Sequence, residues 1–165
     1  MAIKKSLANI FLQERYHVEL ADAGDADLVA LLIDKLLRES FFPADLPRPE
    51  EIQQTTEYLL SDGRYQAILA YGEDNQAVGV MTVVEGVALR SRGRYGQIMG
   101  IYVSPKQRSK GIGKALMGFL KEHAKQNNWA RLEVVVPSRG DAPTAEKFFQ
   151  HSGFSITGKS LTILL

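Results

Sequence analysis

The chain has 165 residues, 45% hydrophobic and 24% charged, with a formal net charge of +1 and no cysteine. This length suits one domain with a sizeable core. The missing cysteines exclude thiol catalysis, thiolate metal sites and disulfides, and the small net charge argues against a nucleic-acid or membrane-surface partner. Three scattered histidines, His17, His123 and His151, lack metal-ligand spacing, so we expect no metal.

Residues 1–15 contain two lysines and a short apolar stretch that Asn9 interrupts. No small-residue cleavage site follows, and no run approaches the 18 apolar residues of a membrane helix. We interpret residues 1–15 as an N-terminal extension and residues 16–165 as the folded domain of a cytoplasmic protein.

Periodicity predicts an alternating order of strands and helices. A strand is expected at residues 16–20, a helix from an Asp22 or Asp25 cap to about Arg38, and a second helix at about residues 50–60, after a proline-rich loop. The first helix is predicted to bury one stripe of side chains: Leu28, Leu31, Leu32, the Lys35 stem and Leu36. Residues 65–71 and 77–87 read as strands joined by a turn at residues 72–75.

The second half continues the alternation. Strands are expected at residues 97–103 and 131–137, the latter as a parallel strand buried on both faces. A helix is expected between them at residues 110–127. A further helix opens near Asp141 and closes at Gly153, and residues 154–165 supply one or two final strands. The pattern predicts a mixed sheet with helices on both faces.

The segment between residues 103 and 116 has its charges reversed for a helix start. Four basic side chains crowd it, namely Lys106, Arg108, Lys110 and Lys114, and no acid occurs from residue 104 to residue 121. Cations at a helix N-terminus cost about 0.3–1 kcal/mol each, so a bound anion would explain them. Gly111 and Gly113 would let the backbone approach a phosphate closely.

Two familiar phosphate loops do not fit this spacing. A nucleotide-triphosphatase loop requires glycine at the position of Arg108 and Ser or Thr at that of Ala115. A dinucleotide fingerprint requires Gly or Ala at the position of Leu116 and a shorter turn. The pattern that matches in full is Arg-x-x-Gly-x-Gly after a Val-x-Pro strand end.

Residues 103–105 with residues 108–116 resemble the acetyl-CoA signature of the GNAT N-acetyltransferase superfamily. Residues 145–154, which end in Gly153-Phe154, are similar to the last helix of that family. The resemblance covers nearly the whole chain. It implies a single-domain α/β fold, with a mixed, mostly antiparallel sheet of about six to seven strands flanked by about four helices.

The resemblance also implies a binding site for acetyl-CoA as cosubstrate. Backbone N–H groups of the turn would hold the pyrophosphate, a role that falls on Arg108, Ser109, Lys110, Gly111, Ile112, Gly113 and Lys114. The preceding strand would splay from its neighbour and pair with the pantetheine arm through Ile101 and Val103, and Gly100 is compatible with the bulge this needs. Phe148 and Phe149 are interpreted first as core residues, although the family's last helix lines the coenzyme arm and would bring Phe149 to it.

Catalysis is harder to assign, because attack on a thioester requires a neutral amine and hence a proton acceptor. Many family members use a glutamate and a tyrosine at positions where this chain has Met99 and Phe149. The remaining candidates are Glu85, Tyr102 and Glu133, besides ordered water. Alignment of the reactants alone can supply about 7 kcal/mol. The alternative is an acyl-CoA-binding sensor or regulatory module with little activity.

The acceptor stays open between small-molecule amines, peptide N-termini and lysine side chains. The resemblance assigns its selection to the loops at residues 41–49 and 86–96. The apolar closing residues, 161–165, are interpreted either as a strand that pairs across a homodimer or as a buried edge.

Overall fold

The computed structural model describes residues 16–136, 142–158 and 160–163, so the predicted N-terminal extension lies outside them. The strands are β1 (His17–Leu20), β2 (Tyr65–Tyr71), β3 (Ala77–Ala88), β4 (Gly93–Val103) and β5 (Leu132–Val134). The helices are α2 (Ala26–Ser40), α3 (Pro49–Ser61), α4 (Ile112–Gln126) and α5 (Ala142–His151). Within these residues, no helix has the length and apolar character needed to cross a membrane.

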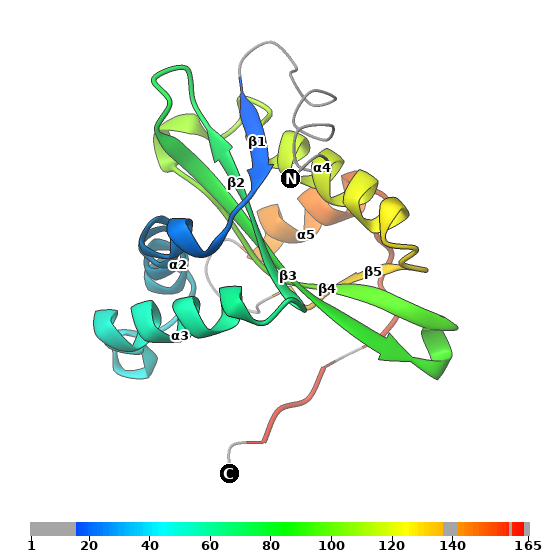
Figure 1. Cartoon of the computed structure of the whole chain (residues 1–165). Coiled ribbons are helices and arrows are strands. Elements are labelled where there is room, and N and C mark those ends of the chain that lie inside the picture. The colour runs from blue at the N-terminus through cyan, green and yellow to red at the C-terminus, as the bar shows by residue number, and fades with distance from the viewer. Residues whose placement is uncertain (1–15, 137–141, 159, 164–165) are drawn as a thin grey trace.

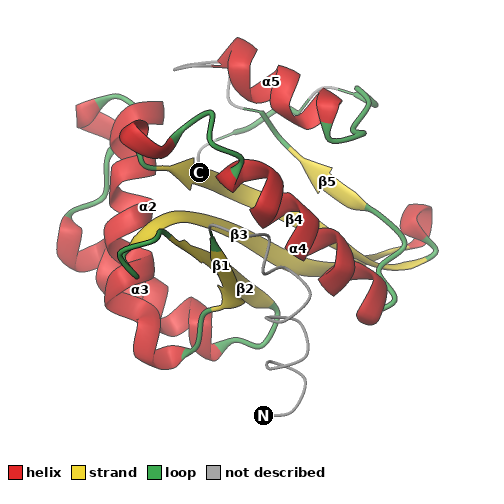
Figure 2. Ribbon diagram, turned by 90° about the horizontal axis from the view of Figure 1, so that it is seen from above, coloured by secondary structure: helices red, strands yellow, loops and turns green. Residues whose placement is uncertain are grey.

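The strands form one sheet in the order β1-β2-β3-β4-β5. Every neighbouring pair is antiparallel except β4 and β5, which are parallel. The predicted fold class is confirmed, with helices on both faces of a mixed, mostly antiparallel sheet. Figures 1 and 2 show α2 and α3 on one side of it and α4 and α5 on the other.

The C-terminal part of the prediction differs from the structure. The described residues contain five strands instead of six to seven, and residues 154–158 and 160–163 belong to none. β5 ends at Val134, three residues short of the prediction, and offers only a short edge for further pairing. The interpretation of the closing residues as a buried edge is also wrong for their described part, because Leu161 and Ile163 are 95% and 80% exposed.

Two apolar layers hold the helices to the sheet. On one face, Val29 and Leu32 of α2 pack with Leu69, Val80 and Tyr102. On the other, α4 packs four apolar side chains onto the sheet, namely Ile112, Leu116, Phe119 and Leu120. Each of these four is at most 1% exposed. Since full burial of such a side chain contributes about 1.5–3 kcal/mol, these four residues anchor α4 to the sheet from its first residue to its middle.

The buried stripe of α2 is rotated from the predicted one. Val29 and Leu32 are fully buried, whereas Leu31 is 51% exposed. Residues three or four apart share a helix face, so a stripe through Val29, Leu32 and Leu36 leaves Leu31 on the opposite side. The helix begins where predicted, because Asp22 and Asp25 form a capping box at the preceding turn.

Candidate functional site

The parallel strands β4 and β5 part halfway along β4. Within the described ranges they pair only at Gly96 with Leu132, Gln97 with Glu133 and Ile98 with Val134. At the same level the ladder between β3 and β4 is irregular: Thr82 lies opposite Gly100 and Val83 opposite Ile98. Met99 is therefore the extra residue of a β-bulge, which bends a strand locally. Beyond it, residues 99–103 of β4 continue without β5, and this parting was predicted.

Helix α2 packs tightly on β4 just past the bulge. A Cβ atom on Gly100 would lie 2.6 Å from Cδ2 of Leu36. The Leu36 side chain thus packs against the space that a side chain at residue 100 would occupy. The extra residue of the bulge is the neighbouring Met99. The Met99 side chain is 60% exposed at the point where the strands part.

The loop from β4 to α4 has the backbone of an anion-binding turn. Gly111 is the N-cap of α4 with φ +95°, in the left-handed region that favours glycine. Apart from its chain neighbours, no residue that the structure describes has an atom within 4 Å of an added Cβ. Ser109 also has a positive φ, 62°. The first N–H groups of a helix lack intrahelical acceptors, and here they belong to Ile112, Gly113 and Lys114. No acidic residue occurs in the first turn of α4.

Gly113 has a second role that the spacing did not indicate. A Cβ atom there would lie 3.1 Å from Cε2 of Phe148 on α5, so the missing side chain lets the two helices meet. Phe149 is 4% exposed and stacks edge to face with Phe148 and Phe154 at 5.2 and 5.4 Å between ring centroids. These contacts place Phe149 in the core beneath the α4 N-terminus.

The basic side chains of the loop point in different directions. Arg108 donates from Nε to the Val103 carbonyl at 2.9 Å and from Nη2 to Glu39 of α2 at 2.5 Å. Lys110 Nζ lies 3.2 Å from Oε1 of Gln107. Of the two cations, Arg108 is thus directed towards α2, and Lys110 stays within the loop.

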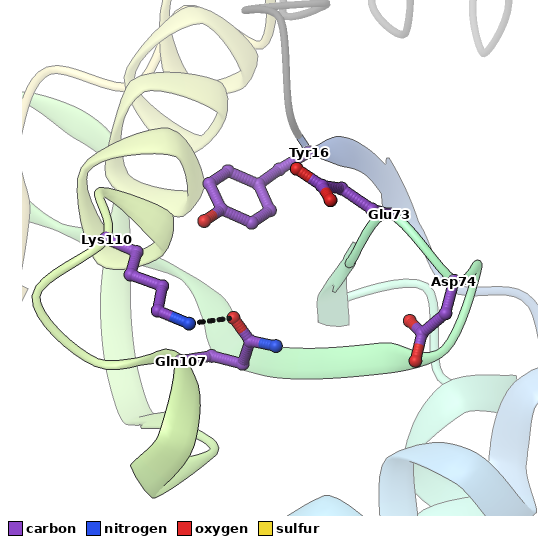
Figure 3. Close-up of a pocket in the computed structure, with 5 residues that line it drawn as sticks. All are labelled: Tyr16, Glu73, Asp74, Gln107 and Lys110. Carbon is purple, nitrogen blue, oxygen red and sulfur yellow. Dashed lines mark hydrogen bonds between the residues drawn. The ribbon is translucent and has the colours of Figure 1, made fainter.

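A hollow of about 520 Å³ lies beside this loop, lined by Tyr16, Glu73, Asp74, Gln107 and Lys110. Figure 3 shows its two carboxylates on the turn between β2 and β3, opposite the Lys110 and Gln107 pair. Two carboxylates disfavour a phosphate in this hollow by like-charge repulsion. The backbone of the α4 N-terminus is therefore the better anion site.

Glu85 lies in a cluster at the opposite end of β4. Its Oε2 accepts a hydrogen bond from Nε1 of Trp129 at 2.6 Å, and its Oε1 lies 3.3 Å from the guanidinium of Arg94. Trp129 packs edge-on against His123 and over Gly96, where a Cβ would lie 2.4 Å from its ring. Burial lowers the pKa of the His123 imidazole, and the charge of nearby Glu85 opposes this shift.

The other two candidates for catalysis are likewise engaged. The Glu133 carboxylate contacts Arg90 at 2.6 Å and Arg131 at 3.3 Å. Glu133 adjoins Leu132, which packs at Gly96 on the Trp129 side, so strand alternation directs Glu133 to the opposite face from Glu85. Tyr102 is 5% exposed in the layer under α2. The structure does not bring the three groups together.

Three features of this region were not predicted from the sequence. Nothing in the composition of the strand marks Met99 as the extra residue of the bulge. Glu39, the partner of Arg108, lies 69 residues away in the chain. Trp129, which fixes Glu85, follows α4 without a motif around it. Trp129 packs over Gly96, which has no side chain, but this fit becomes apparent only once the strands are paired.

Comparison with known proteins agrees with this geometry. The model of the acetyltransferase (GNAT) family matches residues 31–154. A ribosomal-protein-alanine N-acetyltransferase from Brucella melitensis biovar Abortus 2308 is 24% identical, with 91% of this chain and 99% of that chain covered and a TM-score of 0.76. A predicted acetyltransferase from Clostridium acetobutylicum, solved with acetyl-CoA, is 21% identical over 90% and 96% of the two chains, with a TM-score of 0.73.

A third similar structure is an aminoglycoside acetyltransferase from an uncultured soil metagenomic sample, in complex with sisomicin. It is 18% identical, covers 91% of this chain and 95% of that chain, and has a TM-score of 0.69. No curated protein matches the chain. These structures share the fold, and the family model spans most of the sequence, from the middle of α2 to the Gly-Phe pair. The chain therefore belongs to the GNAT family of acetyltransferases.

Proposed function

We propose that this acetyltransferase moves the acetyl group of acetyl-CoA to an amine by direct attack. The observation that carries the proposal is the parting of β4 and β5 at Ile98, directly before the loop whose backbone turns at Gly111. A strand with a free edge followed by an open helix N-terminus offers N–H and carbonyl groups in a row, ending in an anion site.

The residues present fit such a coenzyme. The pyrophosphate would lie on the backbone N–H groups of residues 108–114, where Gly111 leaves open space and no acid occurs in the first helical turn. Ile101 would pair with the pantetheine arm through its main chain, and Val103 through its N–H, since β5 does not accompany β4 there and the Val103 carbonyl accepts from Arg108. When bound, the coenzyme supplies an activated acyl group as a thioester.

The proposed handling of the proton follows from how the charged groups are engaged. Glu85 is tied to Trp129 and Arg94, and Glu133 to Arg90 and Arg131. Met99, at the exposed bulge, has no group that titrates. We infer that water accepts the proton that the substrate's ammonium group must lose before the neutral amine attacks the thioester and CoA leaves as the thiolate. The chain accelerates transfer by alignment, which can supply about 7 kcal/mol. Phe149 would line the arm only as an apolar wall.

The test has two stages. Acetyl-CoA and CoA should raise the melting temperature, whereas ATP and NAD at equal concentration should do so much less, as mass action requires of a native-state ligand. Turnover is then measured on a panel of amines that contains peptides with an N-terminal alanine and an aminoglycoside, because similar structures act on or bind these. A larger shift with NAD would contradict the coenzyme assignment. CoA binding without turnover on any amine would favour the sensor module instead.

A further inference from the structure

Arg108 connects the proposed coenzyme loop to helix α2. Its guanidinium has three neighbours: the Val103 carbonyl at 2.9 Å, the Glu39 carboxylate at 2.5 Å and the ring of Tyr102, whose centroid lies 5.8 Å from Cζ. The carbonyl fixes the side chain against the end of β4, and the ring covers one face of the guanidinium. The contact with Glu39 reaches out of the loop, to a helix 69 residues earlier in the chain.

Glu39 lies in the last turn of α2, which ends at Ser40. One turn earlier, Leu36 packs over Gly100 just past the bulge. The end of α2 therefore contacts the unpaired segment of β4 near both of its ends. Leu36 packs at Gly100, and Glu39 is connected to Val103 through Arg108. Residues 41–46 follow directly, and their aromatic side chains Phe41 and Phe42 are 49% and 53% exposed.

An exposed ion pair contributes little to stability on its own, typically about 0–1 kcal/mol. Glu39 and Arg108 are 42% and 45% exposed at their side chains, so this pair is not a major support of the fold. Its importance is positional. A ligand that orders residues 108–114 also fixes the Arg108 backbone, and this lowers the entropy cost of keeping the guanidinium on Glu39.

We propose that Arg108 and Glu39 are a positioning pair through which coenzyme binding orders the end of α2 and residues 41–46. This inference rests on the proposed function, since it takes CoA as the ligand of the loop. By reciprocity, a ligand held by residues 41–46 would strengthen CoA binding by the same factor. The loop and the Phe41–Phe42 segment then respond together to either ligand.

The test is hydrogen exchange of backbone amides with and without CoA, read by mass spectrometry on the full chain. In the native protein, CoA should slow exchange in residues 108–116 and also in residues 41–46, by about fivefold or more, the lower end of ordinary coupling between sites. Glu39→Lys should keep the protection of residues 108–116 but lose that of residues 41–46. Glu39→Gln should keep the first and lose only part of the second, because a glutamine oxygen can still accept from Arg108.

A matched control is Asp34→Asn, which removes the ion pair of Asp34 with Arg38 on the same helix, at 2.7 Å, without reaching the loop. It should behave as the native protein. Loss of protection at residues 41–46 in this control, or its persistence in Glu39→Lys, would overturn the positioning pair. So would protection confined to residues 108–116 in the native protein. Absence of protection there as well would instead refute the coenzyme site, and with it the proposed function.

Discussion

The two ends of β4 differ in what holds them. Residues 93–98, the closed end, are paired with β3 throughout and also with β5 at residues 96–98. Residues 100–103, the open end, are paired with β3 alone. The closed end is surrounded by ion pairs that join Arg90 and Arg131 to Glu133, and Arg94 to Glu85. The open end leads to a loop with cations and no acid of its own.

This difference shows how one strand serves two purposes. At the closed end the carboxylates of Glu85 and Glu133 are ion-paired with arginine side chains, and our proposal leaves them out of the proton transfer. At the open end the main chain itself is left available, which suits binding by backbone groups. The bulge at Met99 separates the closed end from the open end, so a substitution can alter one end while sparing the other.

Deletion of Met99 should have the largest effect. Without the extra residue, Ile98 and Gly100 would lie opposite Val83 and Thr82 in a regular ladder, and β4 would lose its bend. We expect the chain to fold, because the facing of all other β4 residues is unchanged, but to bind CoA at least about a hundredfold more weakly, which corresponds to about 2.8 kcal/mol. Calorimetric titration measures this, with the substitution Met99→Ala as the control that retains the bulge and the affinity. Undiminished binding after the deletion would show that the bend is irrelevant to the ligand.

Substitution of Gly111 should distinguish a loss of CoA binding at the loop from a loss of stability caused by backbone strain. Gly111 and Gly153 share a φ of +95° and have no atom within 4 Å of an added Cβ, so alanine at either should cost a similar amount of stability, about 1 kcal/mol. Only Gly111→Ala adds a methyl group at the proposed phosphate site, and it should weaken CoA binding about tenfold or more. Equal affinities for Gly111→Ala and Gly153→Ala would contradict the location of the site.

Glu85→Gln examines the closed end. The substitution removes the charge facing Arg94 while leaving an oxygen for the Trp129 hydrogen bond, so we expect a loss of about 1 kcal/mol in unfolding free energy by denaturant titration. For an acceptor found in the amine panel, kcat should change less than about tenfold, below the effect of removing a general base. A loss of a hundredfold or more would make Glu85 the base after all.

The smallest effect is expected from His123. Burial lowers its pKa below the ordinary 6.5, so in the window just below that value the unfolded chain binds a proton that the native chain does not. Stability should therefore rise with pH through this window and level off above it. Between about pH 5.5 and about pH 7.5, the melting temperature of His123→Gln should therefore change less than that of the native protein. A variant with the same pH dependence as the native protein would assign it to other groups.

Much of the open end was predictable because its signals are local. The strand end at Val103, the cations and the glycines follow one another closely in the chain. A helix N-terminus that binds an anion explains why they occur together. The same holds for β2, whose bounds match the prediction, and for the approximate bounds of the helices, although the buried stripe of α2 was mispredicted. The predicted parting of β4 from β5 followed from the resemblance and not from the residues themselves.

The closed end and the end of α2 were not predictable in this way. Glu85 meets Trp129 and Arg108 meets Glu39 only through folding, across 44 and 69 residues. A carboxylate in a sequence carries no mark of whether its oxygens will be engaged, so Glu85 and Glu133 were reasonable candidates for a base. The final strands were overestimated because apolar alternation in residues 154–163 predicts pairing without showing that β5 offers an edge long enough for it.

The fit of Trp129 over Gly96 also gives the molecule an optical property. The chain has a single tryptophan, which is 8% exposed and hydrogen-bonded to Glu85. Its fluorescence therefore reports on the closed end alone, without a second emitter to separate. Unfolding would expose the indole and shift its emission to longer wavelength, and protonated His123, whose ring centroid lies 5.5 Å away, would quench it. An emission spectrum that stays constant as CoA is added would be the spectroscopic sign that the two ends of β4 work independently.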